Sequence, residues 1–503
     1  MGGCVTSAMH TVSMNTADYL LQNAADDRVA IIEKKAQHTY RDLRAASARI
    51  LGELLASGAR PGDHIGLLAA NSLFWAASYL AILKLPAVAV PLPTVATPDD
   101  LARKIEFTRL RTLLADRRSL RRVANALPAN LRVRDDALLA ESGPARWESA
   151  TTEFRLDQDA ALMLTSGTTA RPRAVRITHR NIQANTNSII EYLGLSAAER
   201  ILVILPFYYC FGTSLLHTHL RVGGSLAICN TFAYPETALN MAADVQATGI
   251  AGVPSTYQTL LRNTSLPRRE LPSLKKVQQA GGKLPNVFIR ELRDALPHAQ
   301  IFVMYGQTEA TARLSYLPPE LLDEKLGSIG RGIPGVTLRV LDDLGEPVPP
   351  GKVGEIVASG ENISPGYFND PEASAHKFIN GNLYTGDLAT VDEDGFIYVV
   401  DRKSDFIKSL GHRVSSQEVE AKVLELPDVI AAAAIGVPDD LAGEAIKVFA
   451  VLKKKSGLTP EAIITHCKKN LPRHMVPKYV VLLDKLPLNA HGKVVKAKLR
   501  EMG

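Results

Sequence analysis

A loop rich in hydroxyl groups is the stretch of this sequence most suited to binding a charged ligand. Small side chains with O–H groups, beside accessible backbone N–H groups, supply the many hydrogen-bond donors that a polyphosphate requires. The GxxxxGK[ST] pattern of a P-loop NTPase is absent, and the apolar runs 160–164 and 175–177 on either side argue against a flexible linker. We therefore predict a phosphate-binding loop. Its residues are Thr165, Ser166, Gly167, Thr168 and Thr169, with Arg173 just beyond.

The segments around this loop read as alternating strands and helices. Residues 65–70 predict a buried strand, 73–83 a helix after the capping pair Asn71-Ser72, and 87–91 a second strand. Because this order breaks up the uncharged run 66–83, a transmembrane helix is not expected there. Further apolar runs at 201–205, 225–228 and 301–304 extend the alternation. The pattern predicts a large α/β domain of layered sheets.

The second half of the chain has a different character. Residues 128–159 look like a surface connection, whereas turn pairs between short alternating runs over about 325–400 predict an antiparallel, barrel-like β subdomain. Beyond this region, 405–503 predict a small, mobile α+β domain, with a boundary near Ser404. We expect the large domain to span 17–402, after a leader at 1–16 without regular structure.

Composition excludes several classes of function. The 503 residues carry 58 Lys and Arg against 52 Asp and Glu, a net charge of +6, and the basic cluster over 103–122 is interrupted by Glu106 and Asp116. A solvated helical face explains this cluster better than a nucleic-acid site. Four widely spaced cysteines predict a reducing, cytoplasmic setting. Gly2 and Cys4 fit a loose lipidation pattern, but an unstructured leader is the simpler interpretation.

Further motifs occur in a fixed order after the loop. Tyr-Gly-Gln-Thr-Glu spans 305–309, Tyr-Thr-Gly-Asp spans 384–387, Asp-Arg-Lys-Ser-Asp spans 401–405, and Asn-Ala-His-Gly-Lys spans 489–493. With the loop, they resemble the motifs of the AMP-forming adenylating enzymes, which include acyl-CoA synthetases, aryl-CoA ligases, luciferases and peptide-synthetase adenylation domains. The resemblance covers nearly the whole chain and is closest to stand-alone acyl-CoA synthetases. It departs at Ala170, Arg173 and Ala174, where the family has Gly, Lys and Gly, and alanine does not readily adopt positive φ.

The resemblance implies a role for each motif in joining a carboxylate to ATP. Both reactants are anionic, so positive charge is required where they meet. Lys493 is expected to bridge the carboxylate and the α-phosphate. Glu309 is the expected Mg²⁺ ligand, and Thr308 is expected to bind the α-phosphate. The remaining ATP contacts are expected from Arg402 and Asp387 at the ribose, Tyr305 at the adenine, and Gly281, Gly282, Gly306 and Gln307 nearby.

The resemblance also implies a second step, the transfer of the acyl group from AMP to a thiol. In the family, the small domain rotates about a hinge that aligns with Ser404, which would withdraw Lys493 and bring Lys408 and Gly411 to the thiol, most readily that of coenzyme A. The acid pocket is mostly apolar and lacks the Asp of amino-acid-activating domains, so we expect a fatty or other apolar acid without an α-amino group. It comprises Phe207, Tyr208, Tyr209, Cys210, Phe211, Ser255 and Ala280.

Two alternatives to a coenzyme A ligase remain open at this point. The same chemistry could load a free-standing acyl carrier protein instead of coenzyme A. The departures at Ala170, Ala174 and Ser404 also allow a non-catalytic descendant that binds a nucleotide or an acyl group. Acid-dependent pyrophosphate exchange separates the third hypothesis from the first two.

Overall fold

The computed structural model describes residues 14–140, 147, 154–165, 172–232, 234–402, 406–439, 442–489 and 493–502. Several of the predictions fall outside these residues. They are the lipidation pattern at Gly2 and Cys4, most of the leader, the loop residues 166–170 and the hinge residue Ser404. Helix α1 (Thr16–Leu21) begins at the end of the expected leader.

A six-stranded sheet contains the strand, helix and strand expected over 65–91. Strand β3 (His64–Leu68) pairs in parallel with β4 (Val88–Pro91), and α3 (Leu73–Lys84) connects them. The Ser72 side chain accepts a hydrogen bond from the backbone N–H of Trp75 and caps the helix. The sheet order is β6 (Arg132–Asp135), β5 (Thr112–Ala115), β3, β4, β7 (Asp159–Thr165) and β8 (Arg173–Thr178). Strand β6 lies inside 128–159, so the expectation of a plain surface connection there was wrong.

A nine-stranded sheet forms the second layer of the large domain. Its order is β15 (Arg331–Gly332), β14 (Ser315–Leu317), β13 (Gln300–Tyr305), β12 (Lys276–Gln279), β11 (Gly249–Gly252), β9 (Arg200–Val203), β10 (Ser225–Ile228), β1 (Val29–Glu33) and β2 (Ala36–Thr39). The central strands are parallel, and the edge pairs are antiparallel.

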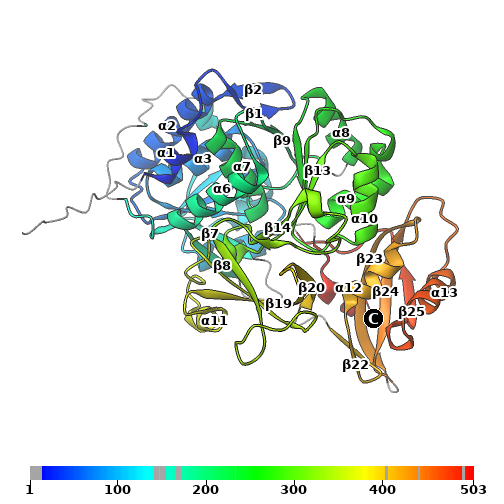
Figure 1. Cartoon of the computed structure of the whole chain (residues 1–503). Coiled ribbons are helices and arrows are strands. Elements are labelled where there is room, and N and C mark those ends of the chain that lie inside the picture. Colours follow the sequence, from blue (N-terminus) through cyan, green and yellow to red (C-terminus); the bar gives the residue numbers. More distant parts are fainter. Residues whose placement is uncertain are drawn as a thin grey trace, which may run out of the picture.

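Helices fill the space between the two sheets and cover their outer faces (Figure 1). One core cluster joins apolar residues of both sheets with α3 and α7, so the two layers share a continuous interior. Besides α1 and α3, the helices of the large domain are α2 (Tyr40–Ala56), α4 (Pro98–Phe107), α5 (Arg117–Val123), α6 (His179–Leu193), α7 (Cys210–Val222), α8 (Pro235–Asp244), α9 (Pro254–Asn263), α10 (Asn286–Ala295) and α11 (Pro371–Lys377).

An antiparallel sheet follows, as the turn pattern predicts. Its strands are β16 (Val336–Leu341), β17 (Gly354–Gly360), β18 (Phe378–Ile379), β19 (Asn382–Val391) and β20 (Ile397–Arg402). Asp387 on β19 lies directly across from Arg402 on β20. Because facing residues of an antiparallel pair project from the same side, this register places the two charged side chains together.

A small α+β domain completes the chain, shown from orange to red in Figure 1. Its sheet consists of β21 (Ile407–Ser409), β22 (His412–Val414), β23 (Val429–Asp439), β24 (Gly443–Leu452) and β25 (Tyr479–Leu482). Its helices are α12 (Ser416–Leu424), α13 (Pro460–Asn470) and α14 (Lys496–Glu501). Among the described residues, no helix has the length and apolar character needed to cross a bilayer.

Candidate active site

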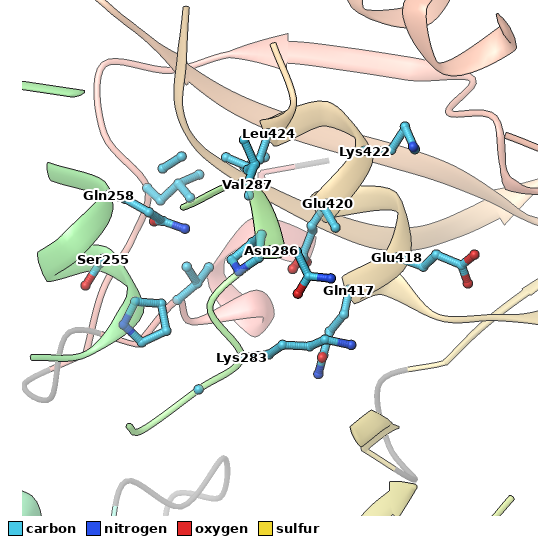
Figure 2. Close-up of a pocket in the computed structure, with 18 of the residues that line it drawn as sticks. Ser255, Gln258, Lys283, Asn286, Val287, Gln417, Glu418, Glu420, Lys422 and Leu424 are labelled. Carbon is cyan, nitrogen blue, oxygen red and sulfur yellow. The ribbon is translucent and has the colours of Figure 1, made fainter. Parts of the chain in front are cut away.

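Two adjoining cavities lie where the large and small domains meet. The larger has a volume of about 1180 Å³ and the smaller about 100 Å³, and Gly281, Arg402 and Lys493 line both. Figure 2 shows one wall of a pocket formed by the large-domain residues Ser255 and Asn286 and the opposite wall formed by helix α12. The site is therefore a cleft with a wall from each domain.

Three residues of the smaller cavity form a hydrogen-bonded group. The Tyr305 hydroxyl donates to Oδ2 of Asp387 over 2.6 Å, and Nε of Arg402 donates to Oδ1 over 3.2 Å. Burial and the neighbouring Asp387 carboxylate raise the pKa of Tyr305 well above its ordinary value, so its hydroxyl stays protonated. The arrangement presents a nearly buried carboxylate, an aromatic ring and an exposed guanidinium to a ligand.

Lys493 of the small domain reaches the same cavity. Its backbone N–H donates to Oδ1 of Asn489 over 3.0 Å. Burial, and after it the like charge of Arg402, lowers the pKa of the Lys493 ammonium below its ordinary value, and the Asp387 and Glu309 carboxylates only partly oppose this shift. Lys493 and Arg402 thus place two positive charges in one cavity. Their mutual repulsion is unfavourable, and an anionic ligand bound between them would offset it.

Glu309 lies in a second group, beside the cavity. The Tyr367 hydroxyl donates to Oε1 of Glu309 over 2.7 Å, and the Arg173 guanidinium lies 4.9 Å from the centre of the Tyr367 ring. Thr311, with φ of +66°, ends the short 3-10 helix that carries Glu309, and such backbone strain in a non-glycine residue is common at functional sites. Arg173 also pairs with Asp370 over 3.3 Å.

Two glycines allow the backbone to approach the cleft closely. Gly281 has φ of +86°, and a Cβ there would lie 2.9 Å from Val253 and 3.2 Å from the Tyr209 hydroxyl. At Gly306, a Cβ would lie 2.0 Å from the backbone oxygen of Ala312. Any side chain at these positions would displace the cavity wall. Gly282, which also lines both cavities, is exposed.

Unpaired polar atoms test whether these residues suit ATP and Mg²⁺. Among the described residues, Oε1 of Gln279 and Nε2 of Gln307 are buried without a hydrogen-bond partner. Gln279 lines the smaller cavity and already donates from Nε2 to the Gly282 backbone oxygen over 2.8 Å, so its oxygen still offers an acceptor. Together with the Asp387 and Glu309 carboxylates and the nearby cations, these donors and acceptors fit a magnesium nucleotide.

The predicted acid pocket is only partly assembled around the cleft. Tyr208, Tyr209 and Cys210 are buried, and Sγ of Cys210 lies 3.5 Å from Oγ1 of Thr308. Burial raises the pKa of Tyr208 to about 12 and also raises that of the Cys210 thiol, so both groups are uncharged. Phe207 packs into the core, with its ring 5.1 Å from that of Trp75.

The other three residues predicted for the acid pocket lie in different environments. Phe211 lies under the Arg313 guanidinium at 3.8 Å, and Arg313 is buried. Ser255 lines the larger cavity. Ala280 is buried just after strand β12.

The remaining predicted residues lie in different places. Lys408 on β21 and Gly411 in the turn before β22 are exposed, and neither lines the two cavities described above. Thr165 ends β7, opposite Arg173 on β8. Ala174 lies in extended strand β8, paired with Leu164, where no positive φ is required. The reduced access of alanine to positive φ therefore has no consequence at Ala174, since strand geometry suits this residue.

Sequence reasoning missed three residues at the site. Tyr367, Gln279 and Lys377 belong to none of the motifs, although Lys377 donates to the Thr385 backbone oxygen over 2.6 Å. Burial lowers the pKa of Lys377, and the nearby Glu309 and Asp387 carboxylates partly oppose this shift. No pattern in the sequence marks Lys377. Nothing local marks Tyr367, since it meets Glu309 only in the folded chain.

A cleft between a large α/β domain and a small domain that supplies a lysine is the arrangement of an adenylate-forming class of enzyme. The description "AMP-binding enzyme" matches residues 21–368, and "AMP-binding enzyme C-terminal domain" matches residues 418–493. The chain belongs to the AMP-binding enzyme family, as the resemblance implied.

Proteins similar to this chain include acid–CoA ligases. A feruloyl-CoA synthase from an Amycolatopsis species is 32% identical over 463 residues, covering 92% of this chain and 93% of that protein. An oxalate–CoA ligase from Arabidopsis thaliana is 30% identical over 501 residues, covering 95% and 97%. The structure of o-succinylbenzoate coenzyme A synthetase from Bacillus subtilis with ATP and a magnesium ion aligns with a TM-score of 0.84 at 29% identity, covering 96% of this chain and 99% of that one. These relatives confirm the expected enzyme class.

Proposed function

We propose that this protein uses ATP and Mg²⁺ to convert a carboxylic acid to an acyl-adenylate and then transfers the acyl group to coenzyme A. The position of Lys493 carries the proposal, because this small-domain ammonium shares a cavity with Tyr305, Asp387 and Arg402 of the large domain. The relatives named as CoA ligases support coenzyme A as the acceptor.

In the first step, the chain's own groups hold two anions together. Lys493 and Arg402 offset the negative charges of the carboxylate and the α-phosphate, while Thr308 donates its hydroxyl to the phosphate. Asp387 accepts hydrogen bonds from the ribose hydroxyls, and Tyr305 stacks on the base. Glu309, held by the Tyr367 hydroxyl, would ligate Mg²⁺, which offsets charge on the phosphates. The carboxylate oxygen then bonds to the α-phosphorus as pyrophosphate leaves.

The second step requires a different position of the small domain. In the present position, Lys493 lines the cleft and Gly411 is exposed outside it. Rotation about the proposed hinge at Ser404 withdraws the lysine and brings Lys408 and Gly411 to the cleft. The thiol sulfur then attacks the acyl carbon, and AMP leaves as the thioester forms.

The acid that best suits this pocket has no α-amino group. Arg313 is buried, and its positive charge lowers the pKa of both Tyr209 and Cys210 against the effect of burial. An α-ammonium placed there would meet like charge, whereas an apolar chain would meet aromatic rings. The three described cysteines are free and buried, which supports the proposed cytoplasmic location.

Pyrophosphate exchange with matched acids tests this function. We expect exchange with 4-methylpentanoate or 3-phenylpropanoate to exceed that with leucine or phenylalanine, which differ by the α-amino group. Ferulate, oxalate, 2-succinylbenzoate and decanoate complete the panel. The best acid is then offered coenzyme A, with a phosphopantetheinylated acyl carrier protein as the competing acceptor. Absence of exchange with every acid would contradict the proposal. Transfer of the acyl group to the carrier protein alone would show that the carrier protein, and not coenzyme A, is the acceptor.

A further inference from the structure

One arginine of the large domain donates three of its hydrogen bonds to the small domain. Arg262 lies near the end of α9, and only 3% of its side chain is exposed. Its guanidinium forms a bidentate pair with the Glu291 carboxylate of α10, in which Nη2 donates to Oε1 over 2.7 Å and Nε donates to Oε2 over 3.3 Å. The Phe288 ring centre lies 4.1 Å from the same guanidinium. The large domain thus fixes the plane and direction of this group.

The other three N–H groups of Arg262 point across the domain boundary. Nη2 donates to the Leu424 backbone oxygen over 3.0 Å, and Nη1 donates to the backbone oxygens of Leu426, over 3.1 Å, and Val429. A guanidinium has five N–H donors, and all five are paired in this arrangement. Two pair within the large domain, and three pair with the small domain.

The acceptors lie where a helix needs such a partner. Leu424 is the last residue of α12. The last four carbonyl groups of a helix have no N–H partner within the helix and need a donor from elsewhere. A cation at this end also interacts favourably with the helix dipole. Arg262 therefore caps a small-domain helix from the large domain.

The opposite end of α12 has a partner of opposite charge. The buried Asp401 carboxylate accepts from the Ser416 backbone N–H over 3.0 Å and from the hydroxyls of Ser415 and Ser416 over 3.0 and 3.1 Å. Asp401 lies three residues before the proposed hinge at Ser404, so this contact is close to the rotation axis. Leu424 lies about 12 Å farther along the helix than Ser416, at 1.5 Å per residue. Rotation about the hinge therefore displaces Leu424 more than it displaces the contact at Asp401.

We propose that Arg262 is a positioning residue that selects the small-domain position used for adenylation. Its three interdomain hydrogen bonds hold α12 where Lys493 lines the nucleotide cavity, and they must break when the domain rotates. Glu291 acts with Arg262 by aiming the guanidinium. The inference rests on the proposed two-step function, and it assigns Arg262 to the first step alone.

The two half-reactions, measured separately, distinguish this role from a general structural one. Arg262→Gln is expected to lower kcat for acid-dependent pyrophosphate exchange about tenfold, because hydrogen bonds that favour one domain position are lost. Thioester formation from supplied acyl-adenylate and coenzyme A is expected to remain within about threefold of the unmodified enzyme. Arg262→Lys, which keeps the charge without the fork, should recover part of the exchange rate.

A matched arginine serves as the control. Arg269 also belongs to the large domain, but its Nη1 binds Asn240 over 2.7 Å and Glu236 over 3.3 Å within that domain. Arg269→Gln is expected to leave both half-reactions unchanged. Equal loss of both half-reactions in Arg262→Gln, or loss of neither, would overturn the proposal.

A distance measurement decides the proposal without catalysis. Spin labels at Tyr234→Cys and Met502→Cys, which are 71% and 54% exposed, report the separation of the domains in a Cys4→Ser background. With saturating ATP and Mg²⁺, Arg262→Gln is expected to shift or broaden the main distance peak, whereas Arg269→Gln should not. An unchanged peak in Arg262→Gln overturns the assignment. If no acid supports exchange in the unmodified enzyme, the proposed function fails, and the distances still decide the role of Arg262.

Discussion

The large and small domains contribute to the cleft in different ways. The large-domain groups bind one another, as in the contacts from Tyr305 and Arg402 to Asp387 and from Tyr367 to Glu309. The small domain contributes Lys493, which belongs to a separate sheet-and-helix unit and reaches the cavity through the domain interface. The proposed nucleotide site is thus prearranged on one side, and the cation proposed to act in the reaction comes from the other. Changes to the large-domain groups proposed to bind the nucleotide should therefore impair both steps, and changes to the small-domain groups only one.

The largest effect is expected at the centre of the large-domain group. Asp387→Ala removes the acceptor for Tyr305 and Arg402 and the proposed ribose contact. We expect exchange and thioester formation both to fall about 1,000-fold, since two hydrogen bonds to a charged group are lost. Steady-state assays of the two half-reactions check this expectation. Loss of one step alone would break the comparison between the domains.

A smaller, selective effect is expected in the small domain. Gly411→Trp places a bulky side chain where the second step is proposed to need access. We expect thioester formation to fall about 100-fold while exchange is retained, because narrow access hinders only the thiol. Gly411 has φ of +78° and an open Cβ position, and Gly345 in the large domain has φ of +84° and is equally open. Gly345→Trp therefore controls for backbone strain and should spare both steps. Loss of pyrophosphate exchange in Gly411→Trp would contradict the proposal that the small domain takes a different position in each step.

Acid should weaken the folded large domain through its buried histidines. Burial lowers the pKa of His217 in α7 to about 3. Below its unfolded pKa of about 6.5, the unfolded chain binds a proton that the folded chain does not, so stability present at neutral pH is lost as pH falls toward 3. At pH 5 the loss is about 2 kcal/mol.

Thermal unfolding at pH 7.5 and pH 5 measures this loss. His217→Gln should reduce the difference in Tm between the two pH values. His376→Gln, at an exposed position in α11, should leave it unchanged. An identical pH dependence in His217→Gln and the unmodified protein would contradict the assignment to this side chain.

The smallest effect is expected where a hydroxyl supports the proposed metal ligand. Tyr367→Phe removes the donor to Oε1 of Glu309 and leaves the ring beside Arg173. Loss of such a supporting hydrogen bond weakens metal binding about tenfold. A Mg²⁺ titration of the exchange rate measures the change. If the Mg²⁺ requirement is unaltered, Tyr367 does not position Glu309.

Local sequence signals predicted most of the framework that carries these groups. The strand, helix and strand over 65–91 followed from capping residues and uncharged runs, and the structure differs from the prediction by at most two residues at the ends. The motif residues Tyr305, Asp387 and Arg402 were expected at the nucleotide, and their side chains lie together. Their roles at ATP stay predictions.

Local sequence patterns could not predict the contacts between segments that lie far apart in the chain. Arg262 and Leu424 are 162 residues apart, and their pairing depends on how two domains dock. Tyr367 and Glu309 are 58 residues apart, and their side chains meet only in the folded chain. Strand β6 was missed because it carries three charged residues among its four, and its position at the edge of the sheet tolerates them.

Lys493→Ala, assayed for both half-reactions in one preparation, tests the central claim most directly. The account predicts that acid-dependent pyrophosphate exchange falls at least about 100-fold, because the cation between two anions is lost. It also predicts that coenzyme A thioester formation from supplied acyl-adenylate stays within about threefold of the unmodified enzyme. Undiminished exchange, or an equal loss in both steps, would contradict the account.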